Sequence, residues 1–157
     1  MKFLATCPPG REGDASLELE WALKAKVKRT RWGGVLIGES PINRNEALKK
    51  IREFETFALQ KFIPLDYLVP LEELERKIEE IARELPKGSF AVRVKVRGAK
   101  IGEKTLEKKL GGIIKRVTNN PVNLEEPEII VLINVLGKKA GITIARKDEI
   151  VKKEPDD

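Results

Sequence analysis

The sequence predicts an α+β protein of two units, and two patterns and the composition support that fold class. Over residues 1–69 the patterns run strand, helix, hairpin, helix, strand, which is the order of a ferredoxin-like unit. From residue 70 a helix, a strand and a second helix precede a strand that is apolar at nearly every position. With 157 residues and 41% hydrophobic content, the chain has enough apolar surface for both cores. We expect domains at 1–69 and 70–151, then a polar tail at 152–157.

The N-terminal unit begins with a short strand and a helix. Residues 3–6 are typical of a strand, which the following prolines and glycine end. Over residues 15–23 the apolar positions fall loosely on one side of a helix, and Asp14 precedes them as a potential N-cap. We expect Trp21, inside this helix, to belong to the core.

A hairpin, a helix and a further strand complete the unit. Residues 27–31 and 35–37 flank Trp32-Gly33-Gly34, where paired glycines supply the positive φ of a tight turn. Asn43 is the predicted N-cap of the second helix, because a glutamate follows it by three residues. The extended run 58–63 is expected to stop at the next proline.

The second unit starts with a helix over residues 71–85, whose apolar positions have heptad-like spacing. In residues 90–97 apolar residues alternate with small and cationic ones, which predicts one buried and one charged face. A helix and the strands 128–136 and 142–146 follow. The first of these should pair in parallel with 90–97 through a right-handed helical crossover.

Positive charge is concentrated in residues 89–117. This stretch holds nine Lys or Arg residues and two Glu residues, a net charge of +7, whereas the whole chain carries +6. Charge gathered on one strand–helix unit is the electrostatic pattern of a polyanion-binding protein. We therefore predict a binding surface that includes Arg93, Lys95, Arg97, Lys100, Lys104, Lys108, Lys109, Gly111, Lys115 and Arg116.

The helix in this stretch has a distinctive polar sector. At 100° per residue the sector holds Lys104, Lys108, Gly111 and Lys115, with Lys109 and Arg116 widening the patch to one side. A glycine among lysines would let a sugar-phosphate backbone approach the helix. Alternatively, Gly111-Gly112 permits packing against a neighbouring helix and the lysines are a solvated face. The strand cations favour binding, because no acidic residue close in sequence balances them.

A second basic cluster lies in the N-terminal unit, and Lys28, Arg29 and Arg31 are its predicted binding residues. It ends at Trp32, which would stack on a splayed base if exposed. The alternative, which we favour, is that Trp32 fills the small core of the hairpin.

The composition argues against catalysis, metals and cofactors. The chain has no histidine and a single cysteine, so a zinc site and an internal disulfide are not expected. No phosphate-binding loop, dinucleotide fingerprint or nucleophile–histidine pair can be written from these residues. Cys7 is interpreted as a small buried residue, although an exposed Cys7 would be a candidate nucleophile. We expect a cytoplasmic protein without a membrane segment, and its Lys- and Glu-rich composition is thermophile-like.

Three segments together resemble the THUMP domain and the ferredoxin-like domain that precedes it in tRNA-modifying enzymes. They are FALQKFIPLDYLVPLEELERKIEEIA, FAVRVKVRGAKIGEKTLEKKLGGIIKR and PVNLEEPEIIVLINVLGKKAGITIAR. The resemblance implies an α/β THUMP domain with a mixed sheet that binds tRNA. It also implies that the nucleic-acid surface includes Arg93, Arg97, Lys100, Lys104 and Lys108.

The sequence lacks the catalytic domain of most such proteins, so it is similar to the stand-alone adaptors that bring tRNA to a separate RNA cytidine acetyltransferase, which makes acetylcytidine. We expect a non-catalytic tRNA-binding adaptor without cofactor or metal. Three alternatives remain. They are an RNA-binding subunit for tRNA methylation or thiolation, a basic module that docks an acidic protein, and an enzyme that uses Cys7.

Overall fold

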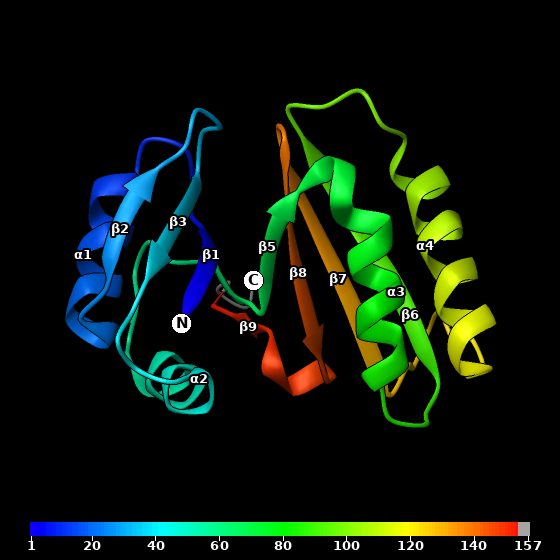
Figure 1. The fold of residues 1–157 in the computed structure, drawn as a ribbon. Coiled ribbons are helices and arrows are strands. Elements are labelled where there is room, and N and C mark those ends of the chain that lie inside the picture. Colours follow the sequence, from blue (N-terminus) through cyan, green and yellow to red (C-terminus); the bar gives the residue numbers. More distant parts are fainter. Residues whose placement is uncertain (154–157) are drawn as a thin grey trace. The chain divides into compact units, whose positions relative to one another are not determined.

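The computed structural model describes residues 1–153 and contains two compact units (Figure 1). One unit is Met1–Leu65 with residues 148–153, and the other is Asp66–Lys147. The first boundary differs from the prediction because strand β5 (Tyr67–Pro70) pairs within the second unit. The last boundary differs because the final strand, β9 (Val151–Lys152), pairs with β4 (Lys61–Leu65) in the first unit. Lys152, predicted in a polar tail, is therefore in a strand, and residues 154–157 of that tail lie outside the described residues.

The first unit is a ferredoxin-like sheet with two helices, as predicted. Its strands lie in the order β2-β3-β1-β4-β9 and every neighbouring pair is antiparallel. Both helices pack their apolar residues on one face of this sheet. The remaining bounds are β1 (Lys2–Thr6), α1 (Glu12–Leu23), β2 (Lys26–Arg29), β3 (Val35–Glu39) and α2 (Arg44–Glu53).

The predicted hairpin forms between β2 and β3, and one glycine determines its turn. Gly34 has φ +76°, and a side chain there would collide with the carbonyl oxygen of Cys7. The Glu12 carboxylate accepts hydrogen bonds from the backbone N–H groups of Gly34 (2.9 Å) and Gly10 (2.7 Å). The bond from Gly34 is the main reason that the pKa of Glu12 lies below its usual value. Glu12 thus ties the loop after β1 to the hairpin.

Three local predictions in this unit are corrected. Helix α1 begins at Glu12, so Asp14 lies in its first turn rather than at its N-cap. Strand β4 continues through Pro64, which pairs with Phe3, whereas β9 on the other side of β4 reaches only Lys61 and Phe62. A proline is tolerated where a strand lacks a partner on one side.

Trp21 is the third correction, because the structure leaves it 77% exposed instead of in the core. The buried residues of α1 are Ala15, Leu19 and Leu23, spaced four apart. Position 21 lies on the opposite side of a helix with this spacing. By contrast, the prediction for α2 is confirmed, because the Asn43 side chain accepts a hydrogen bond of 2.9 Å from the backbone N–H of Glu46.

The second unit is a four-stranded mixed sheet in the order β5-β8-β7-β6. The predicted parallel pairing is confirmed: β6 and β7 pair over their full length from Phe90↔Ile129 to Arg97↔Leu136. The other pairs are antiparallel. The bounds are β5 (Tyr67–Pro70), α3 (Leu74–Glu84), β6 (Phe90–Arg97), α4 (Glu103–Thr118), β7 (Ile129–Leu136) and β8 (Lys139–Ala145), with 3-10 turns at Leu71–Glu73 and Lys147–Glu149.

Helices α3 and α4 cover one face of this sheet (Figure 1). Val92 and Val94 of β6 pack there with Leu110 of α4 and Ile78 of α3. Strand β5 was not predicted as a strand, since it has only four residues and ends in a proline. It is nevertheless an edge strand that pairs with β8.

Candidate nucleic-acid interface

Strand β6 presents its cations on the face opposite the helices. Arg93 and Lys95 are exposed, while the valines that alternate with them lie in or against the core. Arg97 differs because it is half-buried and its guanidinium donates to Asn134 Oδ1 at 3.4 Å. Burial lowers the pKa of Arg97, and the nearby Glu103 carboxylate opposes that shift. Arg93 and Lys95 are therefore the strand cations most available to a phosphate.

The two glutamates of the basic stretch hydrogen-bond the free edge of β6. Val94 N–H donates to the Glu107 carboxylate at 2.9 Å, and Val96 N–H donates to Glu103 at 2.8 Å. Helix α4 therefore runs along the edge of β6 that has no strand partner. These bonds satisfy backbone donors that would otherwise be open to another strand. In the sequence both glutamates count only as opposing charges, but their spacing of four residues, one helical turn, is the signal for this role.

The polar sector of α4 lies next to this glutamate-bonded edge. On the helical wheel Lys104, Lys108 and Gly111 fall directly beyond Glu107, on the side away from the core. Lys104 is 91% exposed, with its Nζ 3.6 Å from the Glu107 carboxylate. Within residues 1–153, the side chains of Arg93, Lys95 and Lys108 make no hydrogen bond or ion pair. We name Arg93, Lys95, Lys104, Lys108 and Gly111 the α4–β6 surface.

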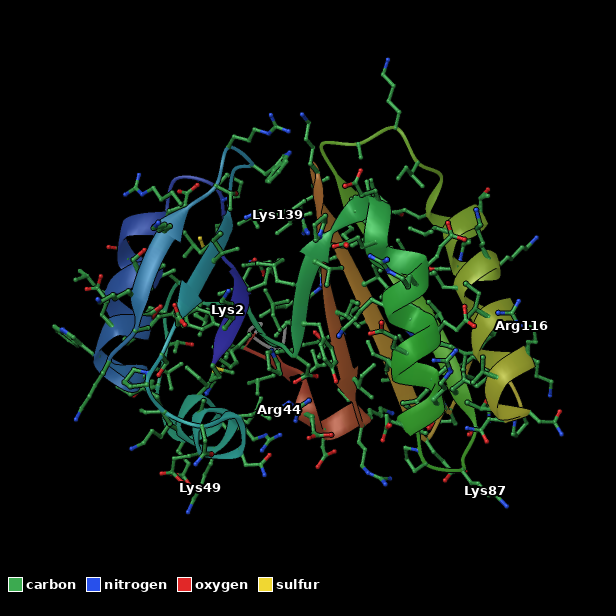
Figure 2. All side chains as sticks on the ribbon, viewed as in Figure 1. Lys2, Arg44, Lys49, Lys87, Arg116 and Lys139 are labelled. Carbon is green, nitrogen blue, oxygen red and sulfur yellow. The ribbon has the colours of Figure 1, made fainter. Side chains whose placement is uncertain are left out.

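The other predicted cations of α4 have partners or point elsewhere. Lys115 donates to the backbone oxygen of Asn120 at 3.2 Å, close to the end of the helix. Lys109 lies 3.3 Å from the Glu75 carboxylate of α3. Arg116, labelled on α4 in Figure 2, lies 3.8 Å from Glu79 of α3. Because these ion pairs balance their charge, Lys109 and Arg116 widen the patch less than the sequence suggested. Lys100, in the loop between β6 and α4, is exposed.

Gly111 and Gly112 serve no packing role that the described chain reveals. A Cβ atom added at either position would meet nothing within 4 Å, so the close-packing alternative lacks support here. Neither has a positive φ. Glycine inside a helix costs about 0.5–1 kcal/mol relative to alanine. The two glycines therefore lower the stability of α4, and no contact within the chain requires them. This favours the hypothesis that a sugar-phosphate backbone approaches the helix at Gly111.

Replacing Gly111 with alanine should separate stability from binding. We expect Gly111→Ala and Gly112→Ala each to raise the free energy of unfolding by about 0.5–1 kcal/mol. Only Gly111→Ala should weaken tRNA binding, because Gly112 lies outside the lysine sector. Urea unfolding and filter binding measure the two effects. Equal tRNA affinity for both variants would contradict a close approach at Gly111.

The second basic cluster does not form one surface. Lys28 pairs with Ile37 and Arg29 with Leu36 of the core, so the two side chains leave opposite faces of β2. Arg29 extends toward α1, where its guanidinium lies 3.2 Å from the Cβ position of Gly13. The guanidinium of Arg31 stacks 4.7 Å over the ring of Trp32. The predicted cluster is thus divided between the two faces of β2 and the Trp32 ring.

Two residues with open sequence predictions, Trp32 and Cys7, are partly buried and buried, respectively. Trp32 is half-buried, so it neither fills the hairpin core nor stands fully free for a base. Cys7 is only 4% exposed, and burial, followed by the nearby Glu12 carboxylate, raises the pKa of its thiol. A thiolate is the nucleophilic form, so these conditions disfavour Cys7 as a nucleophile.

In residues 1–153, no group of three or more His, Cys, Asp or Glu residues is arranged to hold a metal ion. No helix in that range has the length and apolar character needed to cross a membrane.

Comparison with solved structures identifies the fold across both units. TrmN from Thermus thermophilus is 21% identical, with a TM-score of 0.68 over 93% of this chain and 46% of that one. PH1313 from Pyrococcus horikoshii Ot3 is 16% identical, with a TM-score of 0.71 over 96% of this chain and 55% of that one. A 4-thiouridine synthetase, solved as an RNA complex with bound ATP, is 18% identical, with a TM-score of 0.65 over 96% and 41%. The chain spans about half the length of these structures.

The second unit also matches a protein family. No curated protein matches the chain. The family model of the THUMP domain matches residues 70–145, which include α3, the whole of β6 and α4, and the β7–β8 pair. The mixed sheet of this unit agrees with the expectation drawn from the sequence. Residues 70–145 of this chain are therefore a THUMP domain.

Proposed function

We propose that this chain binds tRNA through the α4–β6 surface and presents it to a separate tRNA-modifying enzyme. The observation that carries the proposal is the set of cations without partners on one strand and the adjoining helix. Arg93, Lys95 and Lys108 remain unpaired among residues 1–153, while the acidic residues of the same stretch are held by backbone N–H groups. Phosphate oxygens are the partners that such cations take from a nucleic acid.

The match to the THUMP domain is the reason for proposing RNA as the polyanion that binds this surface. The cations lie within the matched residues 70–145, and one solved structure with the same fold is described as an RNA complex. An RNA with irregular shape suits a surface that offers phosphate contacts and a close-approach glycine rather than a groove-reading helix. We therefore favour tRNA over a protein ligand for the α4–β6 surface.

The modifying chemistry is proposed to reside on another polypeptide, and the resemblance noted above favours an RNA cytidine acetyltransferase. Cys7 is buried and burial raises the pKa of its thiol, which is consistent with a binding role. Purified alone, the chain should leave tRNA unmodified in the presence of acetyl-CoA or ATP. A modified nucleoside formed by the chain alone, and lost in a Cys7→Ser variant, would contradict this part of the proposal.

Nucleoside mass spectrometry of tRNA from cells lacking the protein tests the partner's chemistry. We expect acetylcytidine to disappear while other modified nucleosides remain. Loss of 4-thiouridine instead would support the second candidate, thiolation, which the fold shared with a 4-thiouridine synthetase favours. Re-expression of the wild-type chain should restore the nucleoside. If no nucleoside changes, the role in tRNA modification is wrong.

Nuclease treatment separates RNA binding from protein docking. A complex isolated from cells should dissociate when its tRNA is digested, if tRNA bridges the chain and the enzyme through the α4–β6 surface. Purified tRNA should also bind the chain directly, with an affinity that falls steeply as salt rises. Absence of direct binding at low salt would contradict the proposal and would favour a basic docking module.

A further inference from the structure

The outward side of α1 carries an exposed apolar patch in the first unit. Leu17 is 50% exposed and Trp21, one turn along, is 77% exposed. The opposite side of the same helix already packs Ala15, Leu19 and Leu23 against the sheet. Helix α1 is therefore apolar on two sides, and only one of them is used by the fold. Exposed apolar residues that lie together within a polar surface are typical of an interaction site.

Phe57 is a third exposed apolar residue, and it belongs to a segment that Glu18 holds against α1. The side chain of Phe57 is 81% exposed. The Glu18 carboxylate accepts hydrogen bonds from the backbone N–H groups of Phe57 (2.6 Å), Ala58 (3.0 Å) and Leu59 (2.9 Å). Since Glu18 follows Leu17 and lies one turn before Trp21, the Phe57 segment is anchored beside the apolar side of α1. We call Leu17, Trp21 and Phe57 the α1 patch.

The charges around the α1 patch are mainly negative. Glu18 and Glu20 flank Trp21 on α1, and Glu55 precedes Phe57 by two residues. In residues 1–153, Glu20 and Glu55 have no ion-pair or hydrogen-bond partner for their side chains. The nearest cation in sequence is Lys24, directly after the helix. Platforms that stack nucleic-acid bases combine aromatic residues with cations, so this acidic border disfavours RNA.

We propose that the α1 patch docks a protein segment that is helical, amphipathic and basic. The exposed aromatic side chains would fill the apolar face of such a helix, and its Lys or Arg residues would meet Glu20 and Glu55. Helix-in-groove and helix-on-helix recognition use this combination of apolar anchors and complementary rim charge. The α1 patch shares no residue with the α4–β6 surface, and the two belong to different units. Protein docking and tRNA binding can therefore be removed separately.

Tryptophan emission and peptide anisotropy test this proposal on the full chain. In a Trp32→Phe variant Trp21 is the only tryptophan, so its emission reports on the patch. A synthetic amphipathic helix of leucine and lysine, about 14 residues long, should shift that emission to shorter wavelength. Two control peptides, one with serine for leucine and one with glutamate for lysine, should bind at least about tenfold more weakly. These controls separate the apolar from the charged contribution.

Protein variants locate the contact and exclude other occupants. Trp21→Ala and Phe57→Ser should each weaken binding of the labelled Leu/Lys peptide at least about tenfold and leave tRNA affinity unchanged. Leu124→Ser is a matched control, since Leu124 is 71% exposed but belongs to the other unit. The proposal is overturned if the Leu/Lys peptide does not bind, if Leu124→Ser weakens it equally, or if tRNA alone shifts the Trp21 emission. Self-association that Trp21→Ala abolishes would assign the patch to a second copy instead.

Discussion

A Lys104→Glu, Lys108→Glu double variant should bind tRNA about ten- to a hundredfold more weakly than the wild type at about 0.1 M salt. Both residues lie on the exposed sector of α4 beside the edge of β6, and Lys108 has no partner in residues 1–153. Each lost phosphate contact should reduce the log–log salt slope by about 0.7–0.9. Filter binding at several salt concentrations measures both quantities.

The same helix supplies a matched control. Lys109→Glu with Arg116→Glu makes the same change in net charge, but these residues lie toward Glu75 and Glu79 of α3. We expect this variant to bind tRNA within a few-fold of the wild type, with folding checked by thermal unfolding. Equal weakening by both variants would mean that only total charge matters. Unchanged binding by the Lys104/Lys108 variant would remove the α4–β6 surface from the site.

A Glu18→Ala variant should lower the free energy of unfolding by about 2–4 kcal/mol. Its carboxylate accepts three backbone hydrogen bonds, and two of the donors belong to Ala58 and Leu59, which are each about 1% exposed. Removing the carboxylate leaves these buried N–H groups without a partner, and a charged acceptor is worth more than a neutral one. Urea denaturation, with unchanged m-value, measures the effect.

Glu20→Ala is the control for this variant. Glu20 is exposed on the same helix, and its side chain has no partner among the described residues. Its replacement should change stability by less than about 0.5 kcal/mol. Glu18→Gln should fall between the two, because an amide oxygen still accepts hydrogen bonds. If Glu18→Ala and Glu20→Ala unfold at the same urea concentration, the Phe57 segment does not depend on Glu18.

Much of the fold could be predicted because its elements follow local patterns. Alternation in residues 90–97 predicted which face of β6 carries the cations, and the apolar run in 128–136 predicted a parallel central partner. The Asn43 cap was predictable for the same reason, since cap and acceptor are three residues apart. Each of these signals is contained within one element.

The errors have a common origin in contacts between distant parts of the chain. Trp21 was expected inside because tryptophan is apolar, but the sheet accepts only one side of α1 and leaves the other exposed. Strand β9 was not predicted, because its two residues, Val151 and Lys152, form a strand only by pairing with β4. The basic cluster of residues 28–31 divided because neighbours in a strand point to opposite faces.

The α+β class, the concentration of positive charge in residues 89–117 and the resemblance to a THUMP domain follow from the order of the residues alone. Which of those charges remain available to a ligand depends on how the helices and strands pack. Because α4 packs beside α3, the charges of Lys109 and Arg116 are balanced by glutamates of α3. Because α4 runs along β6, Glu103 and Glu107 accept hydrogen bonds from backbone N–H groups of that strand. A charge count adds residues regardless of position, whereas an ion pair or a hydrogen bond requires two groups within a few ångströms. That proximity is set by the fold.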